Sequence, residues 1–547
     1  MQNATASLAR SEQRASKPAT VAWLAALALL AAAAAWPQGT EKSKTLRVTT
    51  RLVNLSVVVR DAQGHLVKGL KQSDFTILDE GKPQRIGFFS AVDNGHLEAP
   101  PAPPAPDTYT NVLAGGGAPP SVAILLFDAL NSTWISQGYG LFRIRKLLRQ
   151  LQPGDHIGIY VLRNNLYVVH DFTHDASDLV RAIHRYDEHH AHQAVKPEDA
   201  ENDTTGDPEL DRFLSGKDFG RRFSYEGYGV EADTTLAALR DIARQLYSVP
   251  GRKTLIWVTD SIGRMGLYLQ RDLSDFERVL RQQNSPQGLS VEPMIRLMND
   301  ANISLYLVNA SGLGMRSFPM SIEGPMMELA SRTGGRAFVE RNDLETGIRR
   351  AMDDSSYTYS MAYTPDHGKW EGEWRKIQVN VDRQKAEVLT RGGYWALPDS
   401  VPGAEKDRLH VFREVAASPV NATELPLRVH VAATHGPEGA RIEARVHLDV
   451  VPMLSFHDDG HWTGDFELMF VQSGGHKILT ATPRGIHADL KPQQYPYAAR
   501  HGWDMPVELK VIPGAEMLSV ILYDDATNSV GSVHIPLARY IADTPAP

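Results

Sequence analysis

The stretch SVAILLFDALNST, residues 121–133, decides how the middle of this chain is interpreted. It begins with a continuous run of apolar, β-forming residues, as expected for a strand that is buried on both faces of a parallel sheet. The run ends abruptly at Asp128, and the oxygen-bearing side chains of Asn131, Ser132 and Thr133 follow closely. Such a pattern either forms a turn and a helix cap or supplies ligands to a hard cation. The functional interpretation depends on which alternative is right.

Strand-like and helix-like segments alternate after this first strand. The apolar segments are HIGIYVLR, LYVVHDF, KTLIWVTD, ISLYLVNA and GGRAFV, and helical patterns such as TTLAALRDIARQLYSV separate them. This alternation predicts a mostly parallel sheet with helices on both faces. Three further β segments, SYTYSMAYTP, WRKIQVNV and AEVLTRGGYWALP, follow, and we expect them to extend this unit or to pack on it. We therefore predict an α/β domain over residues 121–398.

Two β-rich units are expected to flank the α/β domain. Residues 45–94 contain alternating segments such as VNLSVVVR and read as a small β-sandwich. Residues 425–540 read as a second sandwich, because segments such as RIEARVHLDV alternate strictly. Residues 95–120 are rich first in proline and then in glycine, a composition typical of a linker.

The first 36 residues have the pattern of a targeting segment. Basic residues precede VAWLAALALLAAAAA at residues 21–35, and small residues end this apolar run. The run is shorter than the roughly 20 residues that span a bilayer. We predict a signal peptide over residues 1–36 that is cleaved near Ala35, with an uncleaved membrane anchor as the alternative. Either form places the protein outside the cytoplasm, as a secreted, periplasmic or cell-envelope protein.

Composition excludes several classes of function. The chain of 547 residues contains no cysteine, which excludes disulfides, thiolate metal sites and cysteine nucleophiles. A net charge of −8 gives no sign of a nucleic-acid partner, because such proteins usually carry a basic face. Neither a phosphate-binding glycine motif nor the nucleophile motif of α/β-hydrolases is present. The histidine-rich segment HRYDEHHAHQ could bind zinc, but we favour a solvated loop.

Two of the predicted strands end in aspartate, Asp128 and Asp260, and both should project into the crevice at the carboxyl edge of the sheet. The segment Asp233-Thr234-Thr235 precedes a predicted helix and is expected at the same edge of the sheet. Carboxylate and hydroxyl oxygens suit Mg²⁺, Mn²⁺ or Ca²⁺. A cation would also relieve the repulsion between two buried aspartates. The alternative is that each aspartate only forms a turn or a cap.

These segments resemble the von Willebrand factor type A domains. In that family a strand ends in Asp-x-Ser-x-Ser, a threonine follows in a later loop, and another strand ends in Thr-Asp. The matching residues are Asp128-Ala129-Leu130-Asn131-Ser132, the Thr234/Thr235 segment and Val258-Thr259-Asp260. More narrowly, the chain is similar to the von Willebrand A-related secreted proteins of the acidobacterial type. The supporting segments are GLKQSDFTILDEGKPQRI, FDALNS, TLAALRDIARQL with VPGRKTLIWV, and TRGGYWA.

The resemblance implies a doubly wound, mostly parallel sheet, which the N- and C-terminal all-β sandwich-like domains predicted from the alternating segments would flank. It also implies a metal-ion-dependent adhesion site for Mg²⁺ or Mn²⁺, with Ca²⁺ as a further option. The residues that would form this site are Asp128, Asn131, Ser132, Thr234, Thr235 and Asp260. Leu130 departs from the family pattern, because it stands where the first serine is expected and cannot bind a metal. Asn131 could offer an amide oxygen instead, and the choice between Thr234 and Thr235 stays open.

The function implied by the resemblance is binding. The metal of such a domain keeps one position open for an acidic group of a partner, here a protein or a cell-surface ligand. We expect no nucleic-acid partner, and contact with a membrane only through an uncleaved signal anchor. Two alternatives remain: a scaffold without metal, and a metal-assisted hydrolase. For the hydrolase, His170 and His174 are the candidate acid–base residues.

Overall fold

The computed structural model describes residues 45–46, 52–93, 105–112 and most of residues 122–541. The longest gaps in that last range are residues 192–224, 263–290 and 311–322. The predicted signal peptide at residues 1–36 and His192 lie outside the described residues. In the part of the chain that is described, no helix is both long and apolar enough to cross a membrane.

A six-stranded sheet forms the middle of the molecule, in the strand order β12-β11-β10-β7-β8-β9. All neighbouring strands in it are parallel except β8 and β9, which are antiparallel. The predicted α/β class is therefore confirmed for this part. The strands are β7 (Val122–Asp128), β8 (Ile157–Leu162), β9 (Leu166–Thr173), β10 (Lys253–Thr259), β11 (Ile303–Asn309) and β12 (Ala337–Phe338).

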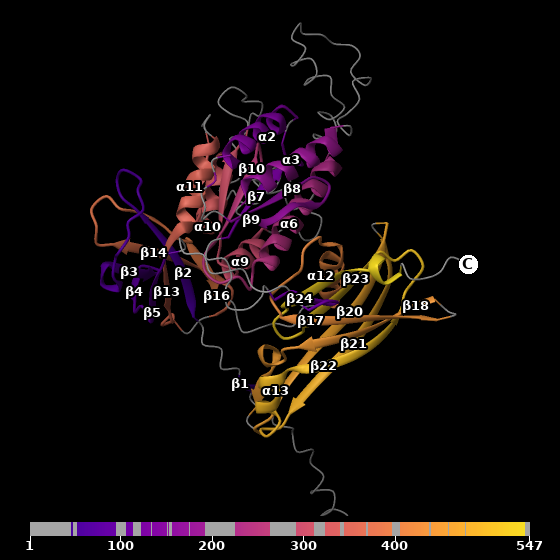
Figure 1. Cartoon of the computed structure of the whole chain (residues 1–547). Helices are drawn as coiled ribbons and strands as arrows, with labels where there is room; N and C mark the ends of the chain where they lie inside the picture. Colours follow the sequence, from indigo (N-terminus) through magenta and orange to yellow (C-terminus); the bar gives the residue numbers. More distant parts are fainter. Residues whose placement is uncertain are drawn as a thin grey trace, which may run out of the picture.

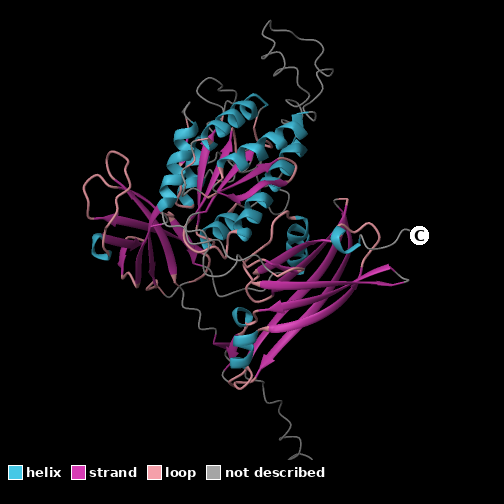
Figure 2. Cartoon of the chain, viewed as in Figure 1, coloured by secondary structure: helices cyan, strands magenta, loops and turns pink. Residues whose placement is uncertain are grey.

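Helices cover both faces of this sheet (Figures 1 and 2). One face packs on α6 (Tyr225–Gln245), α9 (Glu292–Asp300) and α10 (Glu323–Arg332). The other face packs on α2 (Trp134–Leu148), α3 (Ala176–Ala191) and α11 (Leu344–Ser356). Successive side chains of a strand point to opposite faces, so Ile124 joins the first core and Leu125 the second. This two-sided burial explains why the strands are apolar throughout.

The N-terminal sandwich is built from two segments that are far apart in sequence. Its two sheets have the orders β15-β2-β13-β5 and β16-β14-β3-β4. The first segment supplies β2 (Val53–Arg60), a 3-10 turn at Gln72–Asp74, β3 (Phe75–Asp79), β4 (Lys82–Gln84) and β5 (Phe88–Asp93). The second supplies β13 (Tyr357–Tyr363), β14 (Glu373–Val381), β15 (Glu387–Leu389) and β16 (Gly393–Ala396). The α/β domain is thus inserted between the two halves of this sandwich.

This arrangement corrects the predicted boundary of the α/β domain at residue 398. The strands after Ser356 do not extend the six-stranded sheet, because β13 pairs with β2 and β5, and β14 pairs with β3. The reason is physical: the apolar side chains of β2 need a facing sheet, and residues 53–93 alone are too short to supply a sufficient core. Both segments contribute to one shared hydrophobic core.

The C-terminal sandwich also takes strands from the beginning of the chain. One sheet has the order β1-β19-β20-β23-β24, with β21 paired to β20, and the other has the order β22-β18-β17-β6. Its strands are β1 (Thr45–Leu46), β6 (Thr108–Thr110), β17 (Leu427–Gly436), β18 (Gly439–Leu448), β19 (Ser455–His457), β20 (Trp462–Gly474), β21 (Lys477–Leu490), β22 (Trp503–Lys510), β23 (Met517–Asp524) and β24 (Val530–Pro536). Its helical parts are α12 (Glu405–Ala417), a 3-10 turn at Val451–Met453, α13 (Tyr495–His501) and α14 (Ala538–Ile541).

Residues 105–112 are not linker, although they fall in the predicted linker. β6 pairs with β17, and the neighbouring Asn111 is buried. The Asn111 amide nitrogen donates to the carbonyl oxygens of Ala422 and Leu425, each at 2.7 Å, and its amide oxygen accepts from the Leu427 N–H at 2.8 Å. The β6–β17 pairing and the Asn111 side chain together hold this segment in the C-terminal sandwich.

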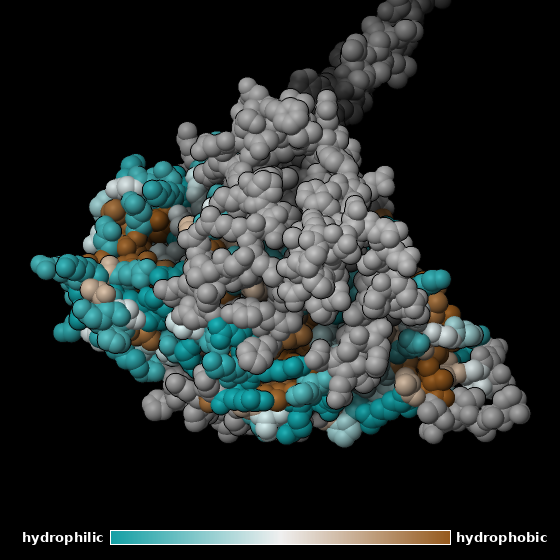
Figure 3. Space-filling view, turned by 90° about the horizontal axis from the view of Figure 1, so that it is seen from above, coloured by the Kyte–Doolittle hydropathy of each residue, from teal (hydrophilic) through white to brown (hydrophobic). Residues whose placement is uncertain are grey.

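Buried ionic contacts hold the N-terminal sandwich on the α/β domain. Arg60 of β2 donates from Nε to Asp354 Oδ1 at 2.6 Å, and the Tyr306 hydroxyl donates to Asp354 Oδ2 at 2.8 Å. Arg252 of the α/β domain donates from Nη1 to the carbonyl oxygen of Ser56 on β2 at 3.3 Å. On the face seen in Figure 3, the described surface is mostly hydrophilic, and its hydrophobic residues form several separate groups.

Candidate functional site

The predicted site lies at the carboxyl edge of the six-stranded sheet, where β7 and β10 end side by side. The two strands are parallel neighbours, with Phe127 paired to Val258. The chain passes from β7 to β8 on one side of β7, and β10 lies on its other side. Ligands of open α/β sheets bind where the strand order changes direction in this way. The structure brings together Asp128, Asn131, Ser132, Thr235 and Asp260 at this edge.

The carboxylate of Asp128 is fully buried and accepts hydrogen bonds on both oxygens. Oδ1 accepts the backbone N–H of Leu130 at 3.0 Å and that of Asn131 at 2.9 Å. Oδ2 accepts Asn131 Nδ2 at 2.8 Å and Trp257 Nε1 at 2.9 Å, and it lies 3.0 Å from Thr259 Oγ1. A carboxylate has about four lone-pair positions. These donors therefore fill the hydrogen-bonding capacity of Asp128.

Burial raises the pKa of Asp128, because removal from water disfavours the charged form. The hydrogen bonds from Asn131, Trp257 and Thr259 act in the opposite direction. All of these contacts offer hydrogens to the carboxylate, so they favour its ionised form. Asp128 is thus held as an internal acceptor that organises the loop after β7.

The Asn131 side chain connects Asp128 with α6. Its Nδ2 donates to Asp128 Oδ2 and, at 3.0 Å, to Thr235 Oγ1. Thr235 Oγ1 in turn donates to the Glu231 carbonyl oxygen at 2.8 Å. The opposite amide orientation would bring the Asn131 oxygen against the carboxylate, where two acceptors repel. The amide N–H groups therefore stand between the two oxygens that were predicted to share a cation.

The structure places both predicted threonines inside α6, which begins at Tyr225. The expectation that Thr234 and Thr235 precede a helix is therefore wrong. The reason is that Ala232 and Leu236, four residues apart, already lie on the buried face of this helix. Thr235 is the threonine that contacts Asn131.

Ser132 and Asp260 join the two strand ends. The Oγ of Ser132 accepts the backbone N–H of Asp260 at 3.1 Å, and both residues are buried. Ser132 thus has a structural contact, which holds the loop after β7 against the end of β10. Thr259, which precedes Asp260 at the end of β10, also contacts this cluster, because its Oγ1 lies 3.0 Å from Asp128 Oδ2. The predicted set of site residues did not include Thr259, although the Thr-Asp pair at the strand end contains it.

This arrangement does not fit a resident cation. The Asp128 oxygens are occupied, Leu130 has no ligand atom, and Asn131 directs N–H groups toward the centre. Among the described residues, no group of three or more histidine, aspartate or glutamate side chains is arranged to hold a metal. The metal binding predicted for Asp128, Asn131, Ser132, Thr234, Thr235 and Asp260 stays a prediction.

Of the two predicted acid–base candidates, the one that the structure describes, His170, does not join this site. His170 lies on β9, which β8 separates from β7. It is paired with Ile159, in the middle of β8. Its Nδ1 lies 2.7 Å from the Asp171 carbonyl oxygen. His174 lies outside the described residues. His170 is therefore not placed to act on a water molecule near Asp128.

Comparison with known proteins gives no family assignment. No family model matches the chain, and no curated protein matches it. Solved structures that match part of the chain include a conserved hypothetical protein BatB from Bacteroides thetaiotaomicron, at 12% identity over 43% of this chain and 98% of that chain, with a TM-score of 0.24. A von Willebrand factor type A protein from Catenulispora acidiphila matches at 11% identity over 64% of this chain and 82% of that chain, with a TM-score of 0.22.

A third structure contains three N-terminal domains of the type V pili tip protein Mfa5 from Porphyromonas gingivalis. It matches at 9% identity over 84% of this chain and 97% of that chain, with a TM-score of 0.25. Identities and TM-scores this low assign no function. The site is therefore interpreted from its own geometry.

Proposed function

We propose that this protein is an exported binding module. Its α/β domain presents the carboxyl edge of the sheet to a protein or surface partner, and the two sandwiches hold that domain in place. The contacts of Asp128 with Asn131, of Asn131 with Thr235 and of Ser132 with the Asp260 N–H support the proposal, because they order this edge before a partner arrives. We call this group of residues (Asp128, Asn131, Ser132, Thr235 and Asp260) the rim. Because the rim is already ordered, it loses little conformational entropy when a partner binds.

The contact that carries this proposal is the bridge from Asn131 to Asp128 and Thr235. Its two N–H groups supply hydrogen bonds to the two oxygens that a divalent cation would otherwise hold together. The rim is then rigid without an ion, and partner binding does not depend on metal. Specificity would come from the half-buried residues Ala129 and Leu130, which follow the strand end.

A metal-dependent form of the same function is the second candidate. It is favoured by the convergence of Asp128, Ser132, Thr235 and Asp260 on one edge of the sheet. In this form an acidic group of the partner would complete the coordination of Mg²⁺, Mn²⁺ or Ca²⁺. It requires the Asn131 amide to leave its position between Asp128 and Thr235.

Partner capture from the surface fraction of the source cells tests the proposal. The immobilised protein is compared in buffer with EDTA and in buffer with Mg²⁺. We expect the same partner under both conditions and its loss with Leu130→Arg, which places a charge on the rim. The exposed Arg428→Ala in the C-terminal sandwich is the matched control and should retain the partner. Capture that requires Mg²⁺ and fails for Asp128→Ala would instead support the metal-dependent form.

A further inference from the structure

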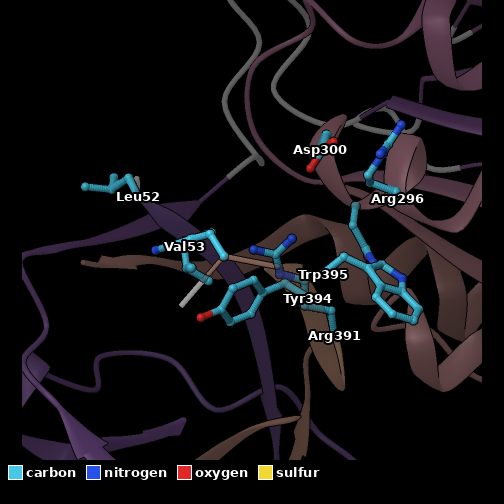
Figure 4. A pocket seen from close by; sticks show the side chains of 9 residues that line it. Leu52, Val53, Arg296, Asp300, Arg391, Tyr394 and Trp395 are labelled. Atoms are coloured by element: carbon cyan, nitrogen blue, oxygen red, sulfur yellow. The ribbon is translucent and has the colours of Figure 1, made fainter. Parts of the chain in front are cut away.

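A second candidate site is a cleft of about 210 Å³ between the N-terminal sandwich and the α/β domain. One wall comes from the end of α9, and the other comes from β16 and the residue Arg391 before it. Since α9 ends immediately before β11 begins, the cleft lies at the amino edge of the sheet, opposite the edge where β7 ends at Asp128. Figure 4 shows Arg391 and Tyr394 in the middle of the cleft, with Arg296 and Asp300 coming from α9.

The Nε of Arg391 is completely buried and has no hydrogen-bond partner among the described residues. Burial lowers the pKa of Arg391, and the charge of Asp300 opposes this effect. No ion pair forms between the two, so Asp300 does not satisfy the buried N–H. A buried donor of this kind is costly unless a bound group accepts its hydrogen.

The charged groups in the cleft favour an anionic ligand. Arg296 and Arg391 are two cations and Asp300 is one anion, which leaves one net positive charge on the lining. Burial raises the pKa of Asp300, and the charges of Arg391 and Arg296 oppose this shift. A guanidinium group matches the geometry of a carboxylate through two parallel hydrogen bonds.

Aromatic residues form a fixed wall beside these charges. The Tyr394 ring lies 6.2 Å from the Trp370 ring between centroids, and the Tyr394 hydroxyl donates to Asp79 Oδ2 at 2.9 Å. Trp395 donates from Nε1 to Glu292 Oε2 at 3.1 Å. Because these hydrogen bonds hold the rings before any ligand arrives, the wall is preformed. Flat apolar faces of this kind suit stacking with a ring.

We propose that this cleft binds a small carboxylate attached to a ring, either a sugar acid or an aromatic acid. The carboxylate pairs with Arg391, and the ring packs on the half-buried Trp395 beside the buried Tyr394. Where the ring carries a hydroxyl group, Asp300 accepts its hydrogen. The cleft is smaller than the roughly 300–1,000 Å³ of sites for drug-sized ligands, so a single ring is the appropriate size. This site is separate from the rim and does not depend on the function proposed for it.

Calorimetric titration of the full chain with sodium glucuronate and with sodium benzoate tests the proposal. Glucose and benzyl alcohol are the neutral counterparts. The acid that binds shows whether the site takes a sugar ring or an aromatic ring. We expect one acid to bind at least about tenfold more tightly than its neutral counterpart. Arg391→Met should weaken binding of that acid about tenfold or more, whereas the exposed Arg428→Met should change it less than about twofold.

The thermal stability of the same variants separates binding from a structural role. Arg391→Met keeps the aliphatic stem and removes an unpaired buried donor, so the Tm should stay unchanged or rise. Arg391→Lys retains the charge without the planar fork, and its affinity should fall between those of the wild type and Arg391→Met. A large fall in Tm for Arg391→Met, equal binding of acid and neutral counterpart, or no binding of either acid would overturn the proposal.

Discussion

Asn131 and Asp128 are joined by a hydrogen bond of 2.8 Å in which the amide donates and the carboxylate accepts. The same amide group donates to Thr235, so one side chain connects the end of β7 to α6. In a metal-ion-dependent adhesion site, a cation would hold these groups together. Here an uncharged amide makes the contacts, which is why the rim can be ordered without an ion.

Replacement of Asn131 should reveal this role in the stability of the protein. Asn131→Ala removes both N–H contacts and leaves Asp128 less well satisfied, so the free energy of unfolding should fall by about 1–3 kcal/mol. Asn131→Asp should cost more, because it brings a second carboxylate against Asp128. Chemical denaturation measures both changes. If Asn131→Ala is as stable as the wild type, the bridge does not order the rim.

The Asn131→Asp variant makes a second prediction possible. Two carboxylates and the Thr235 hydroxyl would then surround one position, and oxygen ligands of this kind bind Mn²⁺ and Ca²⁺. We expect Mn²⁺ to raise the Tm of Asn131→Asp but not that of the wild type. Thermal unfolding with and without the ion measures this. An equal rise in the Tm of both proteins would show that the Asn131 amide does not occupy the position of an ion.

Trp257 should contribute a polar contact as well as packing. It is fully buried in β10, and its Nε1 donates to Asp128 Oδ2. Trp257→Phe keeps an aromatic ring but removes this donor, and the smaller ring also leaves space in the core, so a loss of about 2–4 kcal/mol is expected. Trp462→Phe is the control, since Trp462 lies half-buried in the C-terminal sandwich and stacks on Tyr495. Similar losses in both variants would show that the Asp128 contact adds little.

The pair Arg60 and Asp354 should hold the N-terminal sandwich to the α/β domain. Both side chains are buried, and Asp354 also accepts from Tyr306. Asp354→Ala leaves Arg60 as an uncompensated buried charge, and the expected cost is about 3–5 kcal/mol. The double variant Arg60→Met with Asp354→Leu should recover most of this loss. Urea unfolding of the three proteins provides the measurement, and no recovery in the double variant would show that packing dominates.

The stability that the contact between α6 and the C-terminal sandwich provides should depend on pH. Burial raises the pKa of Asp241 to about 7, while the charge of Arg244 opposes the shift and that of Glu414 adds to it. The ordinary value is 3.8, so the folded state binds more protons than the unfolded state between these two pH values. The stabilising contribution of the protonated form is therefore present at low pH and is lost as the pH rises through about 7.

Asp241→Asn tests this pH dependence. The asparagine imitates the neutral acid at every pH, so the variant should gain stability relative to the wild type between about pH 5 and pH 8. Differential scanning calorimetry at several pH values gives the two curves. Parallel curves for the wild type and the variant would show that Asp241 does not titrate in this range.

The sequence predicted the meeting of Asp128 and Asp260 at one edge because parallel neighbouring strands end on the same side. It could not predict which atoms of Asn131 face the carboxylate, since both amide orientations are compatible with the local pattern. The start of α6 was missed because Gly227 and Gly229 stand in a segment that reads as a polar insertion. The pairing of β13 with β2 joins residues about three hundred positions apart, and the alternation within each strand does not specify its partner.

Calorimetric titration of Mn²⁺ into the full-length protein tests the central claim most directly. The wild type should release no heat of binding, because the Asn131 amide already satisfies Asp128 and Thr235. The double variant Leu130→Ser with Asn131→Gly restores a serine where the family pattern has one and removes the amide, so it should bind one ion. Stoichiometric binding of Mn²⁺ to the wild type, abolished by Asp128→Ala, would contradict the claim.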